Sequence, residues 1–397
     1  MRAVVLGACG AVGREVAAGL VARGAFERID LADQDRSRLE ATSGRLQGRG
    51  VTVTRQALDA RDERALGVLF GEADLVLNCT SYNLGPSVLG AAIEAGIDYL
   101  DLGGLYNTPR QLELDHRARA AGVRAVIGCG ATPGLSNMLV GRAARRLDAV
   151  REVHISFASH RDLAPSPGLL DTLLDEFRPG VPRFTWRAGR LSEVRPFDGP
   201  RLVRFSPPLG RQRVYFVPHS ETYTVPRFLD GGARDVSVRG TWRPEHMQLL
   251  EGLSRIGLTR DEPVEVGGIS VRPCDVLRAV LLDRPPREAG ICAFFLHVEV
   301  IGRRAGRPIT VVQRASHPLA WGTSATGRMT AVPAIVGAEM IGRGQVYGSG
   351  VQPPEASFDP ERFVSAVRAL GVKVTTSTTQ GSVPYKRSPK SPSPGRM

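Results

Sequence analysis

The sequence predicts an α/β protein: a doubly wound parallel sheet at the N-terminus, followed by a mixed α+β domain built on a large sheet. Three observations lead to this prediction. Short β-branched runs alternate with helical patterns through the first 130 residues, which is the order of βαβ units. A glycine-rich turn separates the first such run from the helical pattern that follows it. Beyond about residue 150, strand patterns dominate.

The N-terminal region is expected to hold six buried strands with helices between them. The helix after the fourth strand has Pro86 at its first position and stops at Gly96, the usual placement of these residue types. Because strand–helix–strand crossovers give parallel pairing, six strands fit the doubly wound Rossmann fold. The expected strands are residues 2–7, 28–32, 50–54, 74–78, 98–102 and 123–128. The first expected helix follows the glycine-rich turn and ends near residue 24, and the others span residues 36–46, 61–70 and 86–96.

The next region is expected to begin with a helix that has Thr132 as its N-cap and Pro133 in its first turn. The run from Arg303 to Arg307 separates two strand patterns and predicts a hairpin. The expected strands are residues 153–159, 201–205, 213–217, 235–241, 293–301 and 308–313, and the expected helices are residues 244–256, 273–282 and a capped helix from 359 to 371.

These patterns divide the chain into four segments. We expect a Rossmann domain at residues 1–130 and a mixed-sheet catalytic and dimerisation domain at residues 131–320. A C-terminal helical segment follows at residues 321–374. Residues 375–397 are rich in Ser, Thr, Pro and Lys, so we expect a disordered basic tail that buries no core.

Composition excludes several functional classes. The net charge is +12, but the basic residues of the body are dispersed among acids, so no nucleic-acid partner is expected. All three lysines lie within the last 25 residues, which excludes a catalytic lysine in the folded body. No apolar run reaches the roughly 18 residues of a membrane span, and no signal peptide is recognisable.

The cysteines and histidines give no metal-binding pattern. The five cysteines form no C-x-x-C pair and the seven histidines form no H-E-x-x-H motif, so no metal is expected. An odd, scattered set of cysteines suits reduced thiols, and we therefore expect a cytoplasmic protein.

The glycine-rich turn is a candidate dinucleotide site. Gly7, Gly10, Ala11, Val12 and Gly13 follow the first strand and open a helix, with the spacing G-x-x-G-x-x-G. Glycines allow close approach to a pyrophosphate, and the helix start supplies free N–H groups and a positive dipole end. We therefore predict cofactor contacts at these five residues.

Two acidic residues are candidate cofactor contacts, and the first of them favours NAD. Asp33 ends the second strand, where a carboxylate holds the ribose hydroxyls and repels a 2′-phosphate. Asp59, after the third strand, is expected to border the adenine. Arg36 and Arg38 follow closely and suit a phosphate, so NADP stays open.

Polar side chains also end the fourth and fifth strands, near the switch point where such sheets bind ligands. Cys79 and Thr80 end the fourth strand and are expected to contact the cofactor. Asp101 ends the fifth strand, where it is either a catalytic carboxylate or a cap for the next loop.

Several segments together resemble the saccharopine dehydrogenase family, and within it the lysine 6-dehydrogenase-like branch. They extend from the glycine turn to about residue 374, and Thr-Pro-Gly-Leu and Val-Gln-Pro-Pro-Glu are the more specific ones. The matching segments are residues 31–33, 96–102, 130–137, 220–227, 239–243 and 350–355.

The resemblance implies NAD(P)-dependent oxidation of a C–N bond in an amino acid or polyamine derivative. It also implies a C-terminal segment that returns to the Rossmann domain. We expect a homodimer formed through the second sheet, with Asn137, at the end of the 130–137 segment, in contact with substrate. The exact substrate stays open.

Amine oxidation requires a base, because carbon releases hydride only once the neighbouring nitrogen is deprotonated. His246, at the start of helix 244–256, is the leading candidate, with Asp101 the second. His160, His219 and His317 lie at strand ends and rank lower. Arg243 and Arg227 are candidates for binding a substrate carboxylate.

Two other functions stay open at this stage. A non-catalytic NAD(P) sensor would share every glycine, and a reductase of a lipid-linked enoyl or keto group would use the same fold. An enclosed acid–base group facing the cofactor would separate the sensor from an enzyme.

Overall fold

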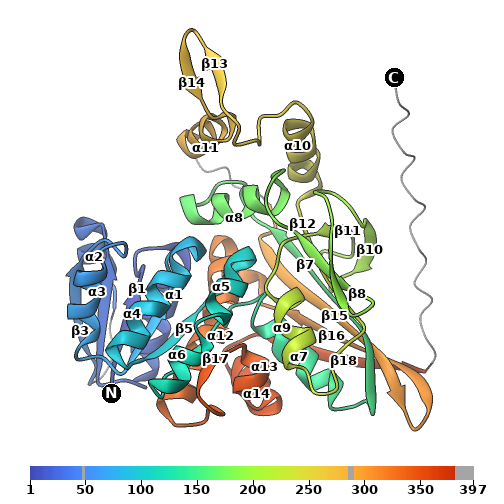
Figure 1. The fold of residues 1–397 in the computed structure, drawn as a ribbon, viewed down its shortest axis with the longest axis horizontal. Coiled ribbons are helices and arrows are strands. Elements are labelled where there is room, and N and C mark those ends of the chain that lie inside the picture. Colours follow the sequence, from blue (N-terminus) through green and yellow to red (C-terminus); the bar gives the residue numbers. More distant parts are fainter. Residues whose placement is uncertain (47–49, 285–289, 381–397) are drawn as a thin grey trace.

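The computed structural model describes residues 1–46, 50–284 and 290–380. Two sheets lie side by side (Figure 1). Three elements project beyond them: α10 (Pro244–Arg255), α11 (Pro273–Asp283) and the hairpin of β13 (Val264–Val266) and β14 (Ile269–Val271). This arrangement confirms the predicted pairing of a doubly wound parallel sheet with a second, mixed-sheet region.

The first sheet is parallel throughout, in the order β17-β6-β5-β4-β1-β2-β3. All six predicted strands are present, and their order is that of the doubly wound dinucleotide-binding fold. The C-terminal segment returns to add β17 beside β6. The strands are β1 Arg2–Leu6, β2 Arg28–Asp33, β3 Thr52–Ala57, β4 Leu75–Asn78, β5 Asp98–Asp101, β6 Arg124–Val126 and β17 Gly350–Gln352.

Helices cover both faces of this sheet, which explains its nearly unbroken apolar strands. On β1, Ala3 and Val5 pack with the helices of one face, and Val4 and Leu6 with those of the other. One face carries α1 Ala11–Arg23, α2 Arg36–Ser43 and α12 Ala325–Gly342, and the other carries α3 Glu63–Phe70, α4 Gly85–Ala95 and α6 Asp115–Ala120.

The second sheet is mixed and has nine strands, in the order β10-β11-β12-β7-β15-β16-β18, with β8 on β12 and β9 on β8. Among the described residues, β12 and β7 are the one pair of this sheet that runs in parallel. The predicted hairpin is confirmed as β15–β16. The strands are β7 Ala149–His160, β8 Phe184–Arg187, β9 Arg190–Glu193, β10 Arg201–Arg204, β11 Arg211–Phe216, β12 Asp235–Trp242, β15 Ala293–Arg304, β16 Arg307–Ser316 and β18 Lys373–Gln380.

Helices in the second region include the three predicted there, α7, α10 and α11, and two that were not predicted, α8 and α9. The prediction that Thr132 caps a helix is wrong, because α7 begins at Leu135 with Gly134 as its N-cap. The elements are α5 Thr108–Leu112, α7 Leu135–Ala144, α8 Pro167–Phe177, α9 Glu221–Phe228, α10 Pro244–Arg255, α11 Pro273–Asp283, α13 Pro354–Ser357, α14 Pro360–Ala369, β13 Val264–Val266 and β14 Ile269–Val271.

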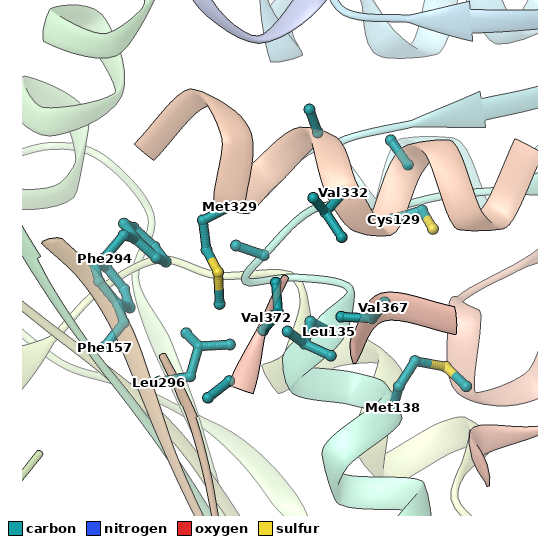
Figure 2. Packing of buried hydrophobic residues seen from close by; sticks show 14 of the residues in the cluster. Cys129, Leu135, Met138, Phe157, Phe294, Leu296, Met329, Val332, Val367 and Val372 are labelled. Carbon is teal, nitrogen blue, oxygen red and sulfur yellow. The ribbon is translucent and has the colours of Figure 1, made fainter. Parts of the chain in front are cut away.

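One hydrophobic cluster joins the two sheets (Figure 2). Met329 and Val332 of α12 lie on one side of this cluster, and Leu296 of the second sheet and Leu135 of α7 lie below them in the view. Because α12 also packs on the first sheet, the two sheets share a core and the space between them is fixed.

The expected start of the disordered tail is wrong. Residues 375–380 belong to β18, which pairs with β16 from Ser316 opposite Lys373 to Ile309 opposite Gln380. Threonine is β-branched and suits an edge strand, so this Thr-rich run forms structure despite its low hydrophobicity. The rest of the expected tail, residues 381–397, lies outside the described residues.

Ending the chain at Val374 should therefore lower its melting temperature by a few degrees, since it removes most of the β16–β18 ladder. A chain ending at Gln380 is the matched control and should melt like the full-length protein. Differential scanning calorimetry of the three proteins makes the comparison. Equal melting temperatures would show that β18 adds nothing to stability.

Candidate active site

A cavity of about 670 Å³ opens between the carboxyl ends of the first sheet and one face of the second sheet. Its first half is lined by the glycine turn and by the ends of β2, β3 and β4. Its second half is lined by β7, β12, α8 and the segment that precedes α9. The polar and charged side chains of the second half are Ser159, Arg161, Ser166, Asp171, Thr172, Glu176 and His219.

The glycine turn has the shape that a pyrophosphate requires. Gly7 has a φ of +79°, and a Cβ there would lie 2.9 Å from the carbonyl carbon of Cys79. A Cβ on Gly13 would lie 2.1 Å from the carbonyl oxygen of Gly7. Gly10 is the N-cap residue of α1 and provides no side-chain cap, so the first N–H groups of the helix are available to an anion. The backbone therefore fits a dinucleotide.

The predicted cofactor residues largely meet at this half of the cavity. Asp33 and Asp59 line it together with Gly7, Gly10, Ala11, Val12, Cys79 and Thr80. Gly13 lies behind them, against the turn. The Asp33 carboxylate accepts a hydrogen bond from the Cys9 N–H at 2.9 Å, and Arg38 donates to the Cys9 carbonyl at 2.6 Å. The acid and the arginine therefore both fix the backbone of the turn at Cys9.

Asp101 is a cap in this structure. Its buried carboxylate accepts four hydrogen bonds, from the backbone N–H groups of Gly103 (3.0 Å) and Gly128 (2.6 Å), from the Tyr99 hydroxyl (2.9 Å) and from Gln111 Nε2 (2.5 Å). Burial raises its pKa and these donors oppose that shift. Asp101 is absent from the cavity lining, so its geometry favours the structural alternative over catalysis.

His246 and the two predicted carboxylate-binding arginines also lie outside the cavity lining. His246 is half-buried on α10, where burial lowers its pKa. Arg243 donates to the backbone carbonyls of Arg161 and Ile291, at 3.4 and 2.7 Å. Arg227 is exposed on α9, beside the ring of Phe228. Their surroundings do not support the roles expected for them.

Asn137 is a structural residue at the start of α7. Its Oδ1 accepts the Gly134 N–H at 2.8 Å, and its Nδ2 donates to Thr224 at 3.2 Å and to Glu355 at 2.8 Å. The side chain is fully buried and is absent from the cavity lining. Its predicted contact with substrate is therefore not supported.

His219 is the acid–base group that the structure places in the cavity. It follows β11, immediately before α9, and is 3% exposed. Its Nε2 lies 3.3 Å from Glu176 Oε1 and its Nδ1 lies 3.4 Å from Glu221 Oε2. The ring also lies 5.3 Å, centroid to centroid, from Phe157. One imidazole is thus held between two buried carboxylates.

This environment favours the imidazolium. Burial alone would lower the pKa of His219, but Glu176 and Glu221 outweigh it and raise the pKa to about 9. In turn, His219 and the Thr132 and Ser136 hydroxyls hold the pKa of Glu221 below its usual value despite burial. His219 therefore carries a transferable proton at neutral pH.

Aromatic side chains and a loop form the remaining walls. Phe157 stacks on Phe294 and meets Trp242 edge-on, with ring centroids 5.5 and 5.4 Å apart. Arg161 donates to the carbonyls of Asp162, Leu163 and Leu169, so its guanidinium holds the loop that enters α8. These walls enclose an apolar slot next to His219.

A contact across the cavity connects its two halves. The hydroxyl of Tyr82, just after β4, donates to Asp175 of α8. Tyr106 reaches the same carboxylate at 3.5 Å and meets Tyr82 edge-on. Burial and the neighbouring carboxylate raise the pKa of Tyr82, so its phenol stays a donor.

Sequence reasoning missed Glu176, Glu221 and Tyr82, and it ranked His219 below His246. The one available signal was the position of His219 directly before the 220–227 segment on which the family resemblance partly rests. His246 ranked first because a helix start favours a neutral imidazole. That argument takes no account of where the helix lies relative to the dinucleotide site.

The described residues hold no group of three or more His, Cys, Asp or Glu side chains arranged for a metal ion. Within the same residues, no helix has the length and apolarity needed to cross a membrane. All five cysteines are unpaired. The cavity therefore offers organic acid–base groups and a dinucleotide cradle.

A dinucleotide cradle that opens onto an enclosed acid–base group defines the protein as an NAD(P)-dependent oxidoreductase. The description "Saccharopine dehydrogenase NADP binding domain" matches residues 3–126, and "Saccharopine dehydrogenase C-terminal domain" matches residues 130–372. The chain belongs to the saccharopine dehydrogenase family. This confirms the resemblance at family level, and the branch within the family stays a prediction.

Two curated proteins are similar to this chain, over different shares of its length. A carboxyaminopropylagmatine dehydrogenase from Synechocystis sp. is 23% identical over 94% of this chain and 96% of its own. A saccharopine dehydrogenase (NADP⁺, L-glutamate-forming) from Pyricularia oryzae is 24% identical over 52% of this chain and 48% of its own. Apo saccharopine dehydrogenase (L-Glu forming) from Saccharomyces cerevisiae shares the fold, with a TM-score of 0.66 at 15% identity over 95% of this chain and 99% of that one.

Proposed function

We propose that the protein oxidises a C–N bond in an amino acid or polyamine derivative, with NAD(P)⁺ as the hydride acceptor. The observation that carries the proposal is His219, enclosed beside the dinucleotide cradle and held by Glu176 and Glu221. The curated relatives support the substrate class, because one is named for carboxyaminopropylagmatine and the other for saccharopine.

His219 supplies the proton chemistry in this proposal. The neutral imidazole accepts the proton of the substrate amine, which frees the nitrogen lone pair to assist loss of hydride from the adjacent carbon. Water then adds to the imine carbon and the C–N bond breaks, giving a carbonyl compound, an amine, reduced cofactor and one proton overall. In the reverse direction the imidazolium donates that proton.

The walls of the second half suit such a substrate. Phe157, Trp242 and Phe294 present apolar surface to an alkyl chain. Asp171 of α8 also lines the slot, with its carboxylate paired to Arg278, and Glu176 of the same helix faces His219. The slot therefore suits an aliphatic amine.

An absorbance assay at 340 nm tests the function. Secondary amines that join an amino acid to an alkyl amine are offered with NAD⁺ and, separately, with NADP⁺. The proposal expects a rise in absorbance with at least one of them. Cofactor binding with no turnover on any secondary amine, amino acid or polyamine would instead favour the non-catalytic sensor.

We further propose that the enzyme prefers NAD(H) to NADP(H), because Asp33 lies in the cofactor half of the cavity. Asp33→Ala should weaken NADH binding by about 10–100-fold, as expected for loss of a charged hydrogen bond worth roughly 1.5–3 kcal/mol. Asp33→Asn is the matched control for the turn, since its amide oxygen can still accept the Cys9 N–H. Calorimetric titration with both cofactors measures the change. Unaltered NADH affinity in Asp33→Ala would refute the preference.

We also propose a cytoplasmic homodimer. The five unpaired cysteines support a reducing compartment. Leu191 on β9 and Leu202 on β10 are exposed apolar residues of the second sheet, which support association through that sheet. Light scattering should give about twice the chain mass of 42.7 kDa, and the mass of a single chain would contradict the dimer.

A further inference from the structure

Buried polar side chains continue from His219 away from the cavity. Behind the imidazole, Glu221 accepts hydrogen bonds from the hydroxyls of Thr132 at 2.6 Å and Ser136 at 2.7 Å. Ser136 lies in the first turn of α7 and Glu221 is the first residue of α9, so these bonds join the two helix starts. The carboxylate that faces His219 is therefore held from the side opposite the cavity.

The next residue of α7 extends this network to the C-terminal segment. Asn137 donates to Thr224 of α9 at 3.2 Å and to Glu355 Oε1 at 2.8 Å. Glu355 lies on α13, which follows β17 and packs against both α7 and α9. Its other oxygen, Oε2, is buried and has no hydrogen-bond partner among the described residues.

Resting on the proposed role of His219, we propose that Glu355 is a positioning residue that favours the charged form of His219 through Asn137, Ser136 and Glu221. Glu355 touches neither the cavity nor the reacting atoms. It acts as a second negative charge behind Glu221, and it fixes the relative positions of the two helix starts. The C-terminal segment thereby contributes to the active site from outside it.

The charges around the network agree with this role. His219 faces Glu176 from α8 and Glu221 from α9, while Arg161 and Arg183 act mainly on Glu176. Burial raises the pKa of Glu355 to about 7, and the negative charge of Glu221 adds to that shift. Glu355 is therefore partly ionised at neutral pH, where its charge stabilises an imidazolium.

The test compares Glu355→Gln with the unaltered protein. Glutamine keeps an oxygen that accepts the Asn137 bond but carries no charge. The pKa of His219 is followed by NMR of isotope-labelled histidine in the cofactor-free protein, with the signal assigned from His219→Asn. It should fall by about 0.3–1 unit, the size expected for losing one charge several ångströms away in a partly polarisable interior.

Glu361→Gln is the matched control, because Glu361 is an exposed acid of the same segment, on α14, paired with Arg142. It should leave the pKa of His219 unchanged. A Glu355→Gln protein whose His219 titrates within about 0.1 unit of the original overturns the proposal. If the shift occurs but His219→Asn retains full turnover, the coupling stands and the proposed function fails.

A reciprocal measurement covers the case in which Glu355→Gln does not fold. Coupling between two titrating groups is mutual, so losing the imidazolium must raise the pKa of Glu355. The carboxyl signal of Glu355 is followed in the unaltered protein and in His219→Asn. A higher pKa in the variant supports the proposal, and an identical pKa overturns it.

Discussion

Replacing His219 with asparagine should lower the turnover of amine oxidation by about 10²–10⁴-fold, the usual contribution of a positioned base. NADH binding should survive, because the glycine turn and Asp33 lie in the other half of the cavity. Retained NADH affinity also shows that the variant is folded. Steady-state kinetics measures the turnover, and calorimetric titration measures the NADH affinity.

The pH dependence of the rate should identify the same group. Since the pKa of His219 is raised to about 9, the base is mostly protonated at neutral pH. Amine oxidation should therefore accelerate as pH rises toward 9, and this limb should be missing in His219→Asn.

His246→Ala is the matched control, because this histidine lies outside the cavity lining. It should keep nearly full turnover and the same pH limb. If His219→Asn retains more than about a third of the turnover, His219 is not the base. If the rise in rate toward pH 9 is instead lost in His246→Ala, then His246 is the base, as the sequence predicted.

Gly13→Ala should weaken NADH binding by about 10–100-fold, equivalent to losing one or two charge-assisted hydrogen bonds. The new Cβ would lie 2.1 Å from the backbone oxygen of Gly7, so the start of α1 or the turn must move. Either movement displaces the N–H groups that would hold a pyrophosphate. Fluorescence titration with NADH measures the loss.

Gly90→Ala separates this effect from the general cost of changing a helical glycine. Gly90 lies within α4, and a Cβ there meets no atom within 4 Å. Alanine at this position should leave NADH affinity unchanged. If Gly13→Ala binds NADH as well as the Gly90→Ala control does, the turn is not a pyrophosphate site.

The first sheet could be predicted almost completely because its signals are local. Several of its strands are short apolar runs, as in β1 and β4, and the turn from Gly7 to Gly13 depends on the spacing of neighbouring residues. The seventh strand could not be placed in this way. Gly350–Gln352 is only three residues long, and it joins the sheet after the chain has crossed the second region.

The candidate site was harder to predict because it is assembled from distant segments. His219 meets Glu176 across 43 positions of sequence, and the meeting depends on α8, which no pattern had indicated. Asp101 shows a different limit. Its sequence position fitted both a catalytic acid and a cap, and only the donors around it, among them the distant Gly128, distinguish the two.

The β18 strand illustrates a third limit. A Thr-rich run has the composition of a linker, yet residues 375–380 pair with β16 because that strand offers an open edge. Strand formation here depends on the partner strand, which composition does not reveal.

Deuterium transfer tests the central claim most directly. The substrate identified by the 340 nm assay is deuterated on every carbon bonded to the nitrogen and is turned over with NAD⁺ or NADP⁺. We expect the deuterium in the nicotinamide ring of the reduced cofactor, detected by mass spectrometry, together with a carbonyl product. Reduced cofactor without deuterium would show that hydride comes from another position and would contradict oxidation at the C–N bond.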